Sequence, residues 1–285
     1  MGRSLMGAGL RSPDGGDDPL DEVVHGLQAV FLTMEAMILA AGLGTRLRPL
    51  THDIPKALVP VGDKPMLEHV ARRLIDAGCD RLIINVHHHA DQVLRFLDEH
   101  DNFGIDVAVS LEPDQALETG GGLKKAESLF MKKKPFFMHN SDVFTGINLT
   151  ELYITHSDGN AVATLAVREA ETNRFLLFDE DENLCGYGDR EGNEHITGVP
   201  KGGTARLDFC GVQVISPDIF ALMTETGVFS IINTYLRLSK EGHRIRPHRI
   251  DGAVWIDIGK PESLDEARAL LESGWLPSSD LRPKR

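Results

Sequence analysis

A glycine-rich turn followed by three cations is the stretch of this sequence best suited to chemistry. The apolar run 37–39 predicts a buried strand, and the residues after it are small enough to let backbone N–H groups approach a ligand. Arg46, Arg48 and Lys56 then place positive charge beside the turn. Because a guanidinium group can hold phosphate oxygens through paired hydrogen bonds, this combination predicts a triphosphate-binding site. The small residues of the turn are Ala40, Ala41, Gly42 and Gly44.

Two familiar phosphate-binding loops do not match this turn. A P-loop spaces its glycines further apart and continues with Lys-Ser or Lys-Thr, which this turn lacks. The dinucleotide-binding pattern requires a third glycine, and Leu47 stands in that place. That pattern also needs an acidic residue at a strand end, about 20 residues further on, whereas Asp63 lies in a Gly-Asp-Lys-Pro turn. An NAD-dependent oxidoreductase is therefore only a distant alternative.

A second glycine motif consists of Glu118, Thr119 and the three glycines at 120–122, and it leads into a predicted helix. Because these glycines carry no side chains, we expect their backbone to be exposed where a planar base could lie and bond to main-chain groups. The motif predicts a surface for a nucleotide base.

Two aspartates at the ends of apolar segments are candidate metal ligands. The predicted strand at 135–139 leads into Asn140, Ser141 and Asp142, and Asp257 lies in a second apolar segment. A rigid strand can hold a carboxylate in position, and Mg²⁺ prefers one or two carboxylates completed by phosphate oxygens and water. The spacing by itself does not show that the two aspartates meet.

The composition excludes several classes of protein. A formal net charge of −13 disfavours non-specific binding to nucleic acid, which needs a basic face. No apolar run approaches the length of a membrane span. The three cysteines lie far apart with no metal-binding spacing, which is typical of reduced thiols in a cytoplasmic protein.

Strands alternate with amphipathic helices over the first half of the chain. This order predicts right-handed crossovers and an α/β fold with a doubly wound, mostly parallel, Rossmann-like sheet. Ligands of such sheets bind at the carboxyl ends of the strands, where the motifs fall. We predict strands at 37–39, 81–86, 105–111 and 135–139, and helices at 66–77 and 91–98.

The region 161–215 has a different pattern, with short strands joined by polar turns and little helix between them. It predicts an antiparallel excursion that forms one wall of the pocket. Helices return at 217–223 and 231–240, a strand pair is expected at 245–250 and 254–258, and a last helix begins at Pro261.

The joined motif G-x-G-T-R-x-x-P-x-T and P-K-x-L-x-P resembles that of the sugar-1-phosphate nucleotidylyltransferases, and the similarity runs from about residue 34 to 273. The resemblance implies an enzyme in which a sugar 1-phosphate attacks a nucleoside triphosphate and pyrophosphate leaves. It implies that Arg46 and Lys56 grip the triphosphate and are the catalytic residues. Further contacts to the nucleotide are implied for Leu39, Ala40, Ala41, Gly42, Gly44, Thr45, Glu118, Thr119, Gly120 and Asn140.

The resemblance also implies which residues bind the metal ion and which lie near the sugar. It implies that Asp142 and Asp257 hold one Mg²⁺ ion and that the excursion is the sugar-side wall, with Gly211 near the sugar. Many relatives carry Glu-Lys-Pro in the excursion, whose lysine contacts the sugar phosphate, but 185–201 contains no such triplet. Lys201, or else Arg206, is the expected substitute.

Specificity is predicted from the E-T-G-G-G motif and the missing triplet, which are most similar to uridylyltransferases of N-acetylmuramate 1-phosphate. The favoured substrates are therefore UTP with that or a similar hexose 1-phosphate, and a mannose-1-phosphate guanylyltransferase is the alternative. A nucleotide-sugar sensor without catalysis is a more distant one. We expect a monomer or homodimer with no nucleic-acid or membrane partner.

The first 33 residues differ from the rest of the chain. Residues 11–19 are acidic and turn-forming, and 20–32 show weak helical periodicity. Relatives typically begin near the equivalent of Met34. We predict an N-terminal extension at 1–33, flexible or a short helix, before a nucleotidylyltransferase domain at 34–285.

Overall fold

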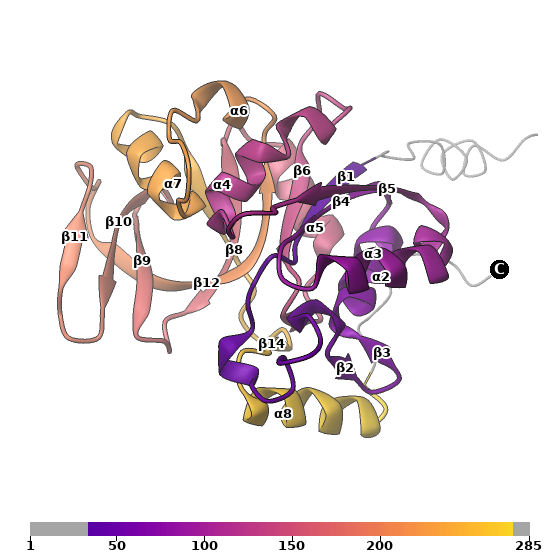
Figure 1. Cartoon of the computed structure of the whole chain (residues 1–285). Coiled ribbons are helices and arrows are strands. Elements are labelled where there is room, and N and C mark those ends of the chain that lie inside the picture. Colours follow the sequence, from indigo (N-terminus) through magenta and orange to yellow (C-terminus); the bar gives the residue numbers. More distant parts are fainter. Residues whose placement is uncertain (1–33, 276–285) are drawn as a thin grey trace, which may run out of the picture. The chain divides into compact units, whose positions relative to one another are not determined.

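Four parallel strands form the centre of the sheet in this computed structural model, which describes residues 34–275 (Figure 1). They are β1 (Met34–Leu39), β4 (Cys79–Val86), β5 (Asp106–Leu111) and β6 (Phe136–Asn140), in the order β6-β1-β4-β5. β1 pairs in parallel with both β4 and β6, so the last residues of these strands lie at one edge of the sheet. The extension predicted at 1–33 lies outside the described residues.

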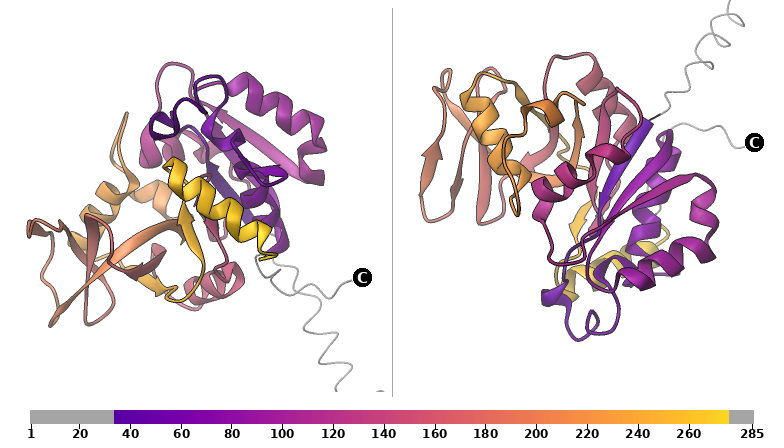
Figure 2. Two further views of the ribbon diagram at one scale, coloured as in Figure 1. Left: turned by 90° about the horizontal axis from the view of Figure 1, so that it is seen from below. Right: turned by 45° about the horizontal axis from the view of Figure 1, so that its top comes forward.

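Helices cover both faces of this sheet, as Figures 1 and 2 show. On one face lie α2 (Met66–Asp76), α3 (Ala90–Glu99) and α5 (Leu149–Ser157). On the other lie α4 (Glu118–Lys125), α6 (Ile219–Leu222) and α7 (Ile231–Lys240). Successive strand side chains point to opposite faces, so both faces of an apolar strand need cover.

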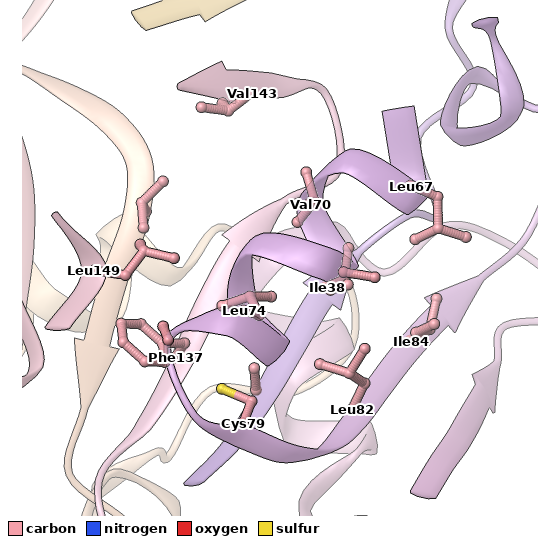
Figure 3. Packing of buried hydrophobic residues seen from close by; sticks show 14 of the residues in the cluster. Ile38, Leu67, Val70, Leu74, Cys79, Leu82, Ile84, Phe137, Val143 and Leu149 are labelled. Carbon is pink, nitrogen blue, oxygen red and sulfur yellow. The ribbon is translucent and has the colours of Figure 1, made fainter. Parts of the chain in front are cut away.

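The core under α2 illustrates this packing (Figure 3). Ile38 of β1 lies beneath Val70 and Leu74 of the helix, and all three are buried. The next strand residue back, Met37, belongs to the cluster on the opposite face. Alternate residues of one strand therefore hold a helix on each side, and the strand ends cannot shift without unpacking the core.

An antiparallel region extends the sheet beyond β6. Its central element is the long strand β12 (Thr204–Ile215), which pairs with β6 at one end and with β8 and β9 along its length. The predicted fold class is confirmed, with a mostly parallel sheet and an antiparallel excursion. The other strands of the excursion are β8 (Ala163–Glu169), β9 (Arg174–Asp179), β10 (Leu184–Asp189) and β11 (Glu194–Ile196).

The prediction that 245–250 and 254–258 pair with each other is wrong. β13 (Ile245–Arg249) lies parallel to β8, and β14 (Trp255–Asp257) lies antiparallel to β7 (Val143–Thr145). The strands form where predicted, but their partners are segments far away in the sequence. This difference matters because β7 directly follows Asp142.

A separate apolar cluster fastens α8 (Pro261–Glu272) to the segment around β2 (Pro60–Val61) and β3 (Lys64–Pro65). Leu264 and Ala267 of the helix are buried against residues from this segment and from β14. The cluster therefore holds together the regions that carry Lys56 and Asp257. Short 3-10 helices occur at η1 (Thr45–Leu47), η2 (Lys56–Leu58), η3 (Asp101–Gly104) and η4 (Glu127–Leu129).

Within residues 34–275, no helix is both long and apolar enough to cross a membrane. The three cysteines are free and buried. Burial raises the pKa of the Cys185 thiol to about 11 and that of Cys210 to about 12, so both remain protonated at neutral pH.

Candidate active site

A cavity of about 350 Å³ opens at the carboxyl ends of β1, β4 and β6, and we call it the strand-end cavity. Ligands of open α/β sheets bind at such an edge. The predicted motifs therefore meet where the fold predicts a ligand. The cavity is lined by Leu39, Ala41, Gly42, Gly44, Thr45, Arg46, Lys56, Asn85, Ala116, Glu118, Thr119, Asn140, Ser141, Asp142 and Gly259.

The glycine turn is shaped by close packing at Gly44, whose φ of 63° lies in the left-handed region. A β-carbon at this position would lie 2.9 Å from Cγ2 of Thr51 and 3.0 Å from Cβ of Lys56. The Thr51 hydroxyl donates to the Gly44 carbonyl oxygen at 2.7 Å and closes the turn. Glycine therefore lets the turn lie directly against the Lys56 segment.

Lys56 is buried, although it follows a polar loop in the sequence. Only 9% of the residue is exposed, and its ammonium group forms an ion pair with Asp142. The Asp142 side chain is 23% exposed and lines the strand-end cavity. A cation and an anion are thus held together at the cavity wall.

The two predicted metal ligands come together through β14. Its pairing with β7 sets Asp257 opposite Val143, and the Ile258 N–H donates to the Asp142 carbonyl oxygen at 2.8 Å. The Oδ1 atom of Asp257 is buried without a hydrogen-bond partner in the part of the chain that the structure describes. Burial, and next the charge of Asp142, raise the pKa of the Asp257 carboxyl.

These features fit a divalent cation. An orphaned buried carboxylate oxygen beside a second carboxylate is costly unless a positive charge completes the site. Two carboxylates agree with the ligand set of Mg²⁺, which takes its other ligands from phosphate oxygens and water. Among the described residues no cluster of three or more His, Cys, Asp or Glu could hold a metal, so an all-protein site is not indicated there.

Arg46 reaches the same region from the glycine turn. A β-carbon at Gly259 would lie 2.6 Å from NH2 of Arg46 and 2.9 Å from its Cζ, so the guanidinium lies directly against this backbone. Gly259 follows Asp257 by two residues, which brings the exposed cation beside the two predicted metal ligands. Side-chain bulk at Gly259 would displace the arginine.

A buried network that the sequence analysis missed supports the wall of the strand-end cavity, which Asn85 lines. The Asn85 side chain accepts from the Ala40 N–H at 2.8 Å and donates to Glu112 at 2.8 Å. The other oxygen of Glu112 accepts from the Leu117 N–H at 2.8 Å, and both side chains are buried. The network joins the ends of β1, β4 and β5. The signal in the sequence was one polar residue, Asn85 or Glu112, near the end of each of two apolar strands, β4 and β5.

The expectation of exposed backbone at 120–122 is wrong. The three glycines lie buried inside α4, and the N–H of Gly120 donates to the Phe229 carbonyl oxygen at 2.9 Å. A β-carbon would lie 2.4 Å from the Phe229 ring at Gly120 and 2.4 Å from the Gly227 carbonyl oxygen at Gly121. These glycines let α4 pack closely, and Glu118 and Thr119 before them line the cavity instead.

Most of the predicted nucleotide contacts line the strand-end cavity, and two do not. Ala40 is buried and its N–H is engaged by Asn85, and Gly120 is engaged by Phe229. Gly211 lies at an irregularity of β12, where a β-carbon would be 2.6 Å from Nδ2 of Asn140. Gly211 therefore makes room for a residue of the cavity wall.

Two larger cavities follow in sequence: the α8 cavity adjoins the strand-end cavity, and the excursion cavity adjoins the α8 cavity. The α8 cavity, of about 850 Å³, includes Arg46, Asp257 and Gly259 together with Arg168, Arg174, Trp255 and Lys260. The excursion cavity, of about 540 Å³, includes Thr172, Arg174, Phe175, Tyr187, His195 and Phe209.

Lys201 lines none of the three cavities. Its exposed ammonium group pairs with Asp181 on the outer surface of the excursion. Arg206 is not a lining residue either, but its guanidinium, which pairs with Glu194, lies 5.2 Å from the centroid of the Phe175 ring, and Phe175 lines the excursion cavity. The position of Lys201 therefore does not support the expected role at the sugar phosphate, and Arg206 lies beside the excursion cavity in an ion pair.

Comparison with known proteins agrees with this site. The model of the family described as nucleotidyl transferase matches residues 35–184. The chain belongs to this nucleotidyl transferase family. The match includes the glycine turn, Lys56, Asp142 and α4, while Asp257 and α8 lie beyond it.

Relatives extend the similarity over most of the chain. An N-acetylmuramate alpha-1-phosphate uridylyltransferase of Caulobacter vibrioides is 34% identical over 83% of this chain and 96% of its own length. A mannose-1-phosphate guanyltransferase of Pichia angusta is 29% identical over 80% of this chain and 62% of its own. The predicted resemblance to sugar-1-phosphate nucleotidylyltransferases is confirmed, and with it the prediction of an enzyme.

Among solved structures, HddC of Yersinia pseudotuberculosis has a TM-score of 0.66 to this nucleotidyl transferase. It is 24% identical and covers 84% of this chain and 100% of its own. At this identity the likeness supports the fold, and it agrees with the doubly wound sheet described above.

Proposed function

We propose that the chain transfers a uridylyl group from UTP to N-acetylmuramate 1-phosphate or a similar hexose 1-phosphate, with Mg²⁺ as cofactor. The observation that carries this proposal is that Arg46, Lys56 and Asp142 line the strand-end cavity, while Asp257, on the strand paired with β7, lines the adjoining α8 cavity together with Arg46. Two cations and a pair of carboxylates are the groups that a triphosphate with its metal requires.

The acceptor phosphate is the nucleophile in this reaction. One of its oxygens attacks the α-phosphorus, the bond from this phosphorus to the bridging β-phosphate oxygen breaks, and pyrophosphate leaves. A phosphate oxygen is already ionised at neutral pH, so no side chain has to remove a proton. Catalysis then depends on alignment and on charge neutralisation by Arg46 and Lys56.

Asp142 and Asp257 are the residues that would hold Mg²⁺. When bound, the ion would neutralise negative charge on the phosphate oxygens. Lys56 is paired with Asp142 and stays near this charge, because its burial prevents it from turning to solvent. A sensor without catalysis would have no need of this arrangement, which disfavours that alternative.

The choice of base rests on the relatives. The uridylyltransferase of Caulobacter vibrioides supports UTP, and the guanyltransferase of Pichia angusta supports the alternative, a mannose-1-phosphate guanylyltransferase. The base side of the cavity is set by Glu118, Thr119 and the buried Asn85–Glu112 pair. A guanine requires more depth there than a uracil.

The test is release of pyrophosphate from UTP, GTP, CTP and dTTP, each combined with N-acetylmuramate, mannose or glucose 1-phosphate and Mg²⁺. We expect UTP with N-acetylmuramate 1-phosphate to give the highest kcat/KM. A preference for GTP of about tenfold, or 1.4 kcal/mol, would contradict the uridylyl proposal and keep the reaction class.

A pair of variants tests the site itself. Arg46→Gln should lower kcat/KM at least about tenfold, because a charge-assisted hydrogen bond to phosphate is lost. Arg95→Gln, on the exposed surface of α3, removes the same charge and should leave kcat/KM unchanged. Equal activity of both variants would refute the assignment of the glycine turn to the triphosphate.

A further inference from the structure

We infer that Arg174 binds the phosphate group of the sugar 1-phosphate acceptor. This inference rests on the proposed function and names a residue that the sequence motifs do not mark. The three cavities form a series in which each shares lining residues with the next.

The strand-end cavity shares Arg46 and Gly259 with the α8 cavity, and the α8 cavity shares Thr172 and Arg174 with the excursion cavity. The α-phosphorus of the nucleotide must lie near the charged end of the first cavity. The acceptor must reach it from the side where Asp257 lies, which is the α8 cavity. A sugar in the excursion cavity would then direct its 1-phosphate into the α8 cavity toward Asp257, past Arg174, which lines both cavities.

Arg174 is the available cation at this junction. Among the described residues its guanidinium has no ion-pair or hydrogen-bond partner. The neighbouring Arg168 pairs with Glu171 at 3.2 Å and lies 4.3 Å from the centroid of the Trp255 ring, so its orientation is fixed. In a chain of net charge −13, an unpaired arginine that lines the same cavity as Arg46 and Asp257 is suited to an anionic substrate.

The backbone that carries Arg174 is held in place by Asp208. This buried carboxylate accepts from the N–H groups of Glu171 and Thr172, each at 2.9 Å. The Thr172 hydroxyl in turn lies 2.7 Å from the Arg174 carbonyl oxygen. The main chain is fixed while the side chain stays exposed, which suits a residue that waits for a ligand.

A guanidinium matches a phosphate monoester because it can donate two parallel hydrogen bonds to two oxygens. The uncharged groups of the sugar do not need a charged partner, so the Arg174 guanidinium is better matched to the phosphate. The acceptor N-acetylmuramate 1-phosphate also has a carboxylate on its sugar, so the test must separate the two anions.

The experiment measures the KM for the acceptor with N-acetylmuramate 1-phosphate and with glucose 1-phosphate, whose sugar is uncharged. Arg174→Gln should raise the acceptor KM at least about tenfold with both, while the KM for UTP changes less than about twofold. Arg174→Lys should recover part of the loss, since it keeps the charge without the paired donors. Arg95→Gln is the matched control.

If the acceptor KM of Arg174→Gln rises with N-acetylmuramate 1-phosphate but not with glucose 1-phosphate, the inference is overturned, since Arg174 would then bind the carboxylate. If the acceptor KM rises in Lys201→Gln but not in Arg174→Gln, the inference is overturned in favour of Lys201 as the residue that binds the sugar phosphate.

Calorimetric titration of the two sugar phosphates into the protein, without turnover, separates this inference from the proposed function. If the wild type releases no pyrophosphate with any pair but binds a sugar 1-phosphate, and Arg174→Gln weakens this binding about tenfold, the inference stands and the proposed function fails. If the wild type neither reacts nor binds, both fail.

Discussion

Of the two aspartates proposed to hold Mg²⁺, one has an ion-pair partner in the folded chain and the other does not, so they affect stability in opposite ways. Asp142 is paired with the buried Lys56, whereas Asp257 has a buried oxygen without a partner in the described part of the chain. The pKa of Asp257 is raised, so this carboxyl favours the fold when protonated, and the contribution is lost as pH rises through its folded pKa. At neutral pH the ionised Asp257 carboxylate lowers the free energy of unfolding of the metal-free protein, and bound Mg²⁺ would remove this loss.

We therefore expect Asp257→Asn to abolish most turnover while the free energy of unfolding in EDTA stays equal or increases. Asp142→Asn should also abolish turnover but lower that free energy by about 1–3 kcal/mol, because the buried ammonium loses its partner. Urea denaturation and a Mg²⁺ titration of pyrophosphate release measure the two effects. Asp181→Asn, on the exposed surface, should change neither. Equal losses of stability in the two site variants would contradict this account.

At the scale of elements, α4 is placed by its glycines. The helix packs so closely on 227–231 that a β-carbon at Gly121 would overlap the Gly227 carbonyl oxygen. The position of the helix decides where Glu118 and Thr119 face the cavity. The glycines at 120–122 thus act on this wall of the strand-end cavity through packing, not through exposed backbone.

Gly121→Ala should lower the free energy of unfolding by about 1–3 kcal/mol through overpacking, and should raise the KM for the nucleotide. The gain in helix propensity, about 1 kcal/mol, offsets only part of this loss. Gly198→Ala is the control, because a β-carbon there meets open space. A variant as stable as the wild type would mean that the helix and the facing segment separate at little cost.

At the scale of the whole molecule, two buried histidines link stability to pH. Burial lowers the pKa values of His139 and His156 to about 4, from an ordinary value of 6.5. The unfolded chain therefore binds more protons than the folded chain between these two values. Stability should fall as pH decreases from 6.5 to about 4, by up to about 3 kcal/mol for each histidine.

Urea denaturation at a series of pH values measures this dependence. His156→Asn should reduce the slope of unfolding free energy against pH in that window, beyond any constant loss from its bond to Thr164. His100→Gln, on an exposed position, should leave the slope as in the wild type. An unchanged slope in His156→Asn would show that this histidine does not titrate differently in the two states.

The sequence by itself determined the alternation of strands and helices, the fold class and the glycine turn with Arg46 and Lys56. These features depend on local periodicity and on residue types close together in the chain. Tertiary structure decided the rest. The meeting of Asp142 and Asp257 depends on the pairing of β14 with β7, and the burial of 120–122 depends on the segment packed against α4. Contacts between distant segments leave no periodic pattern, so the position of Arg174 in two cavities, and of Lys201 outside them, is set by the fold.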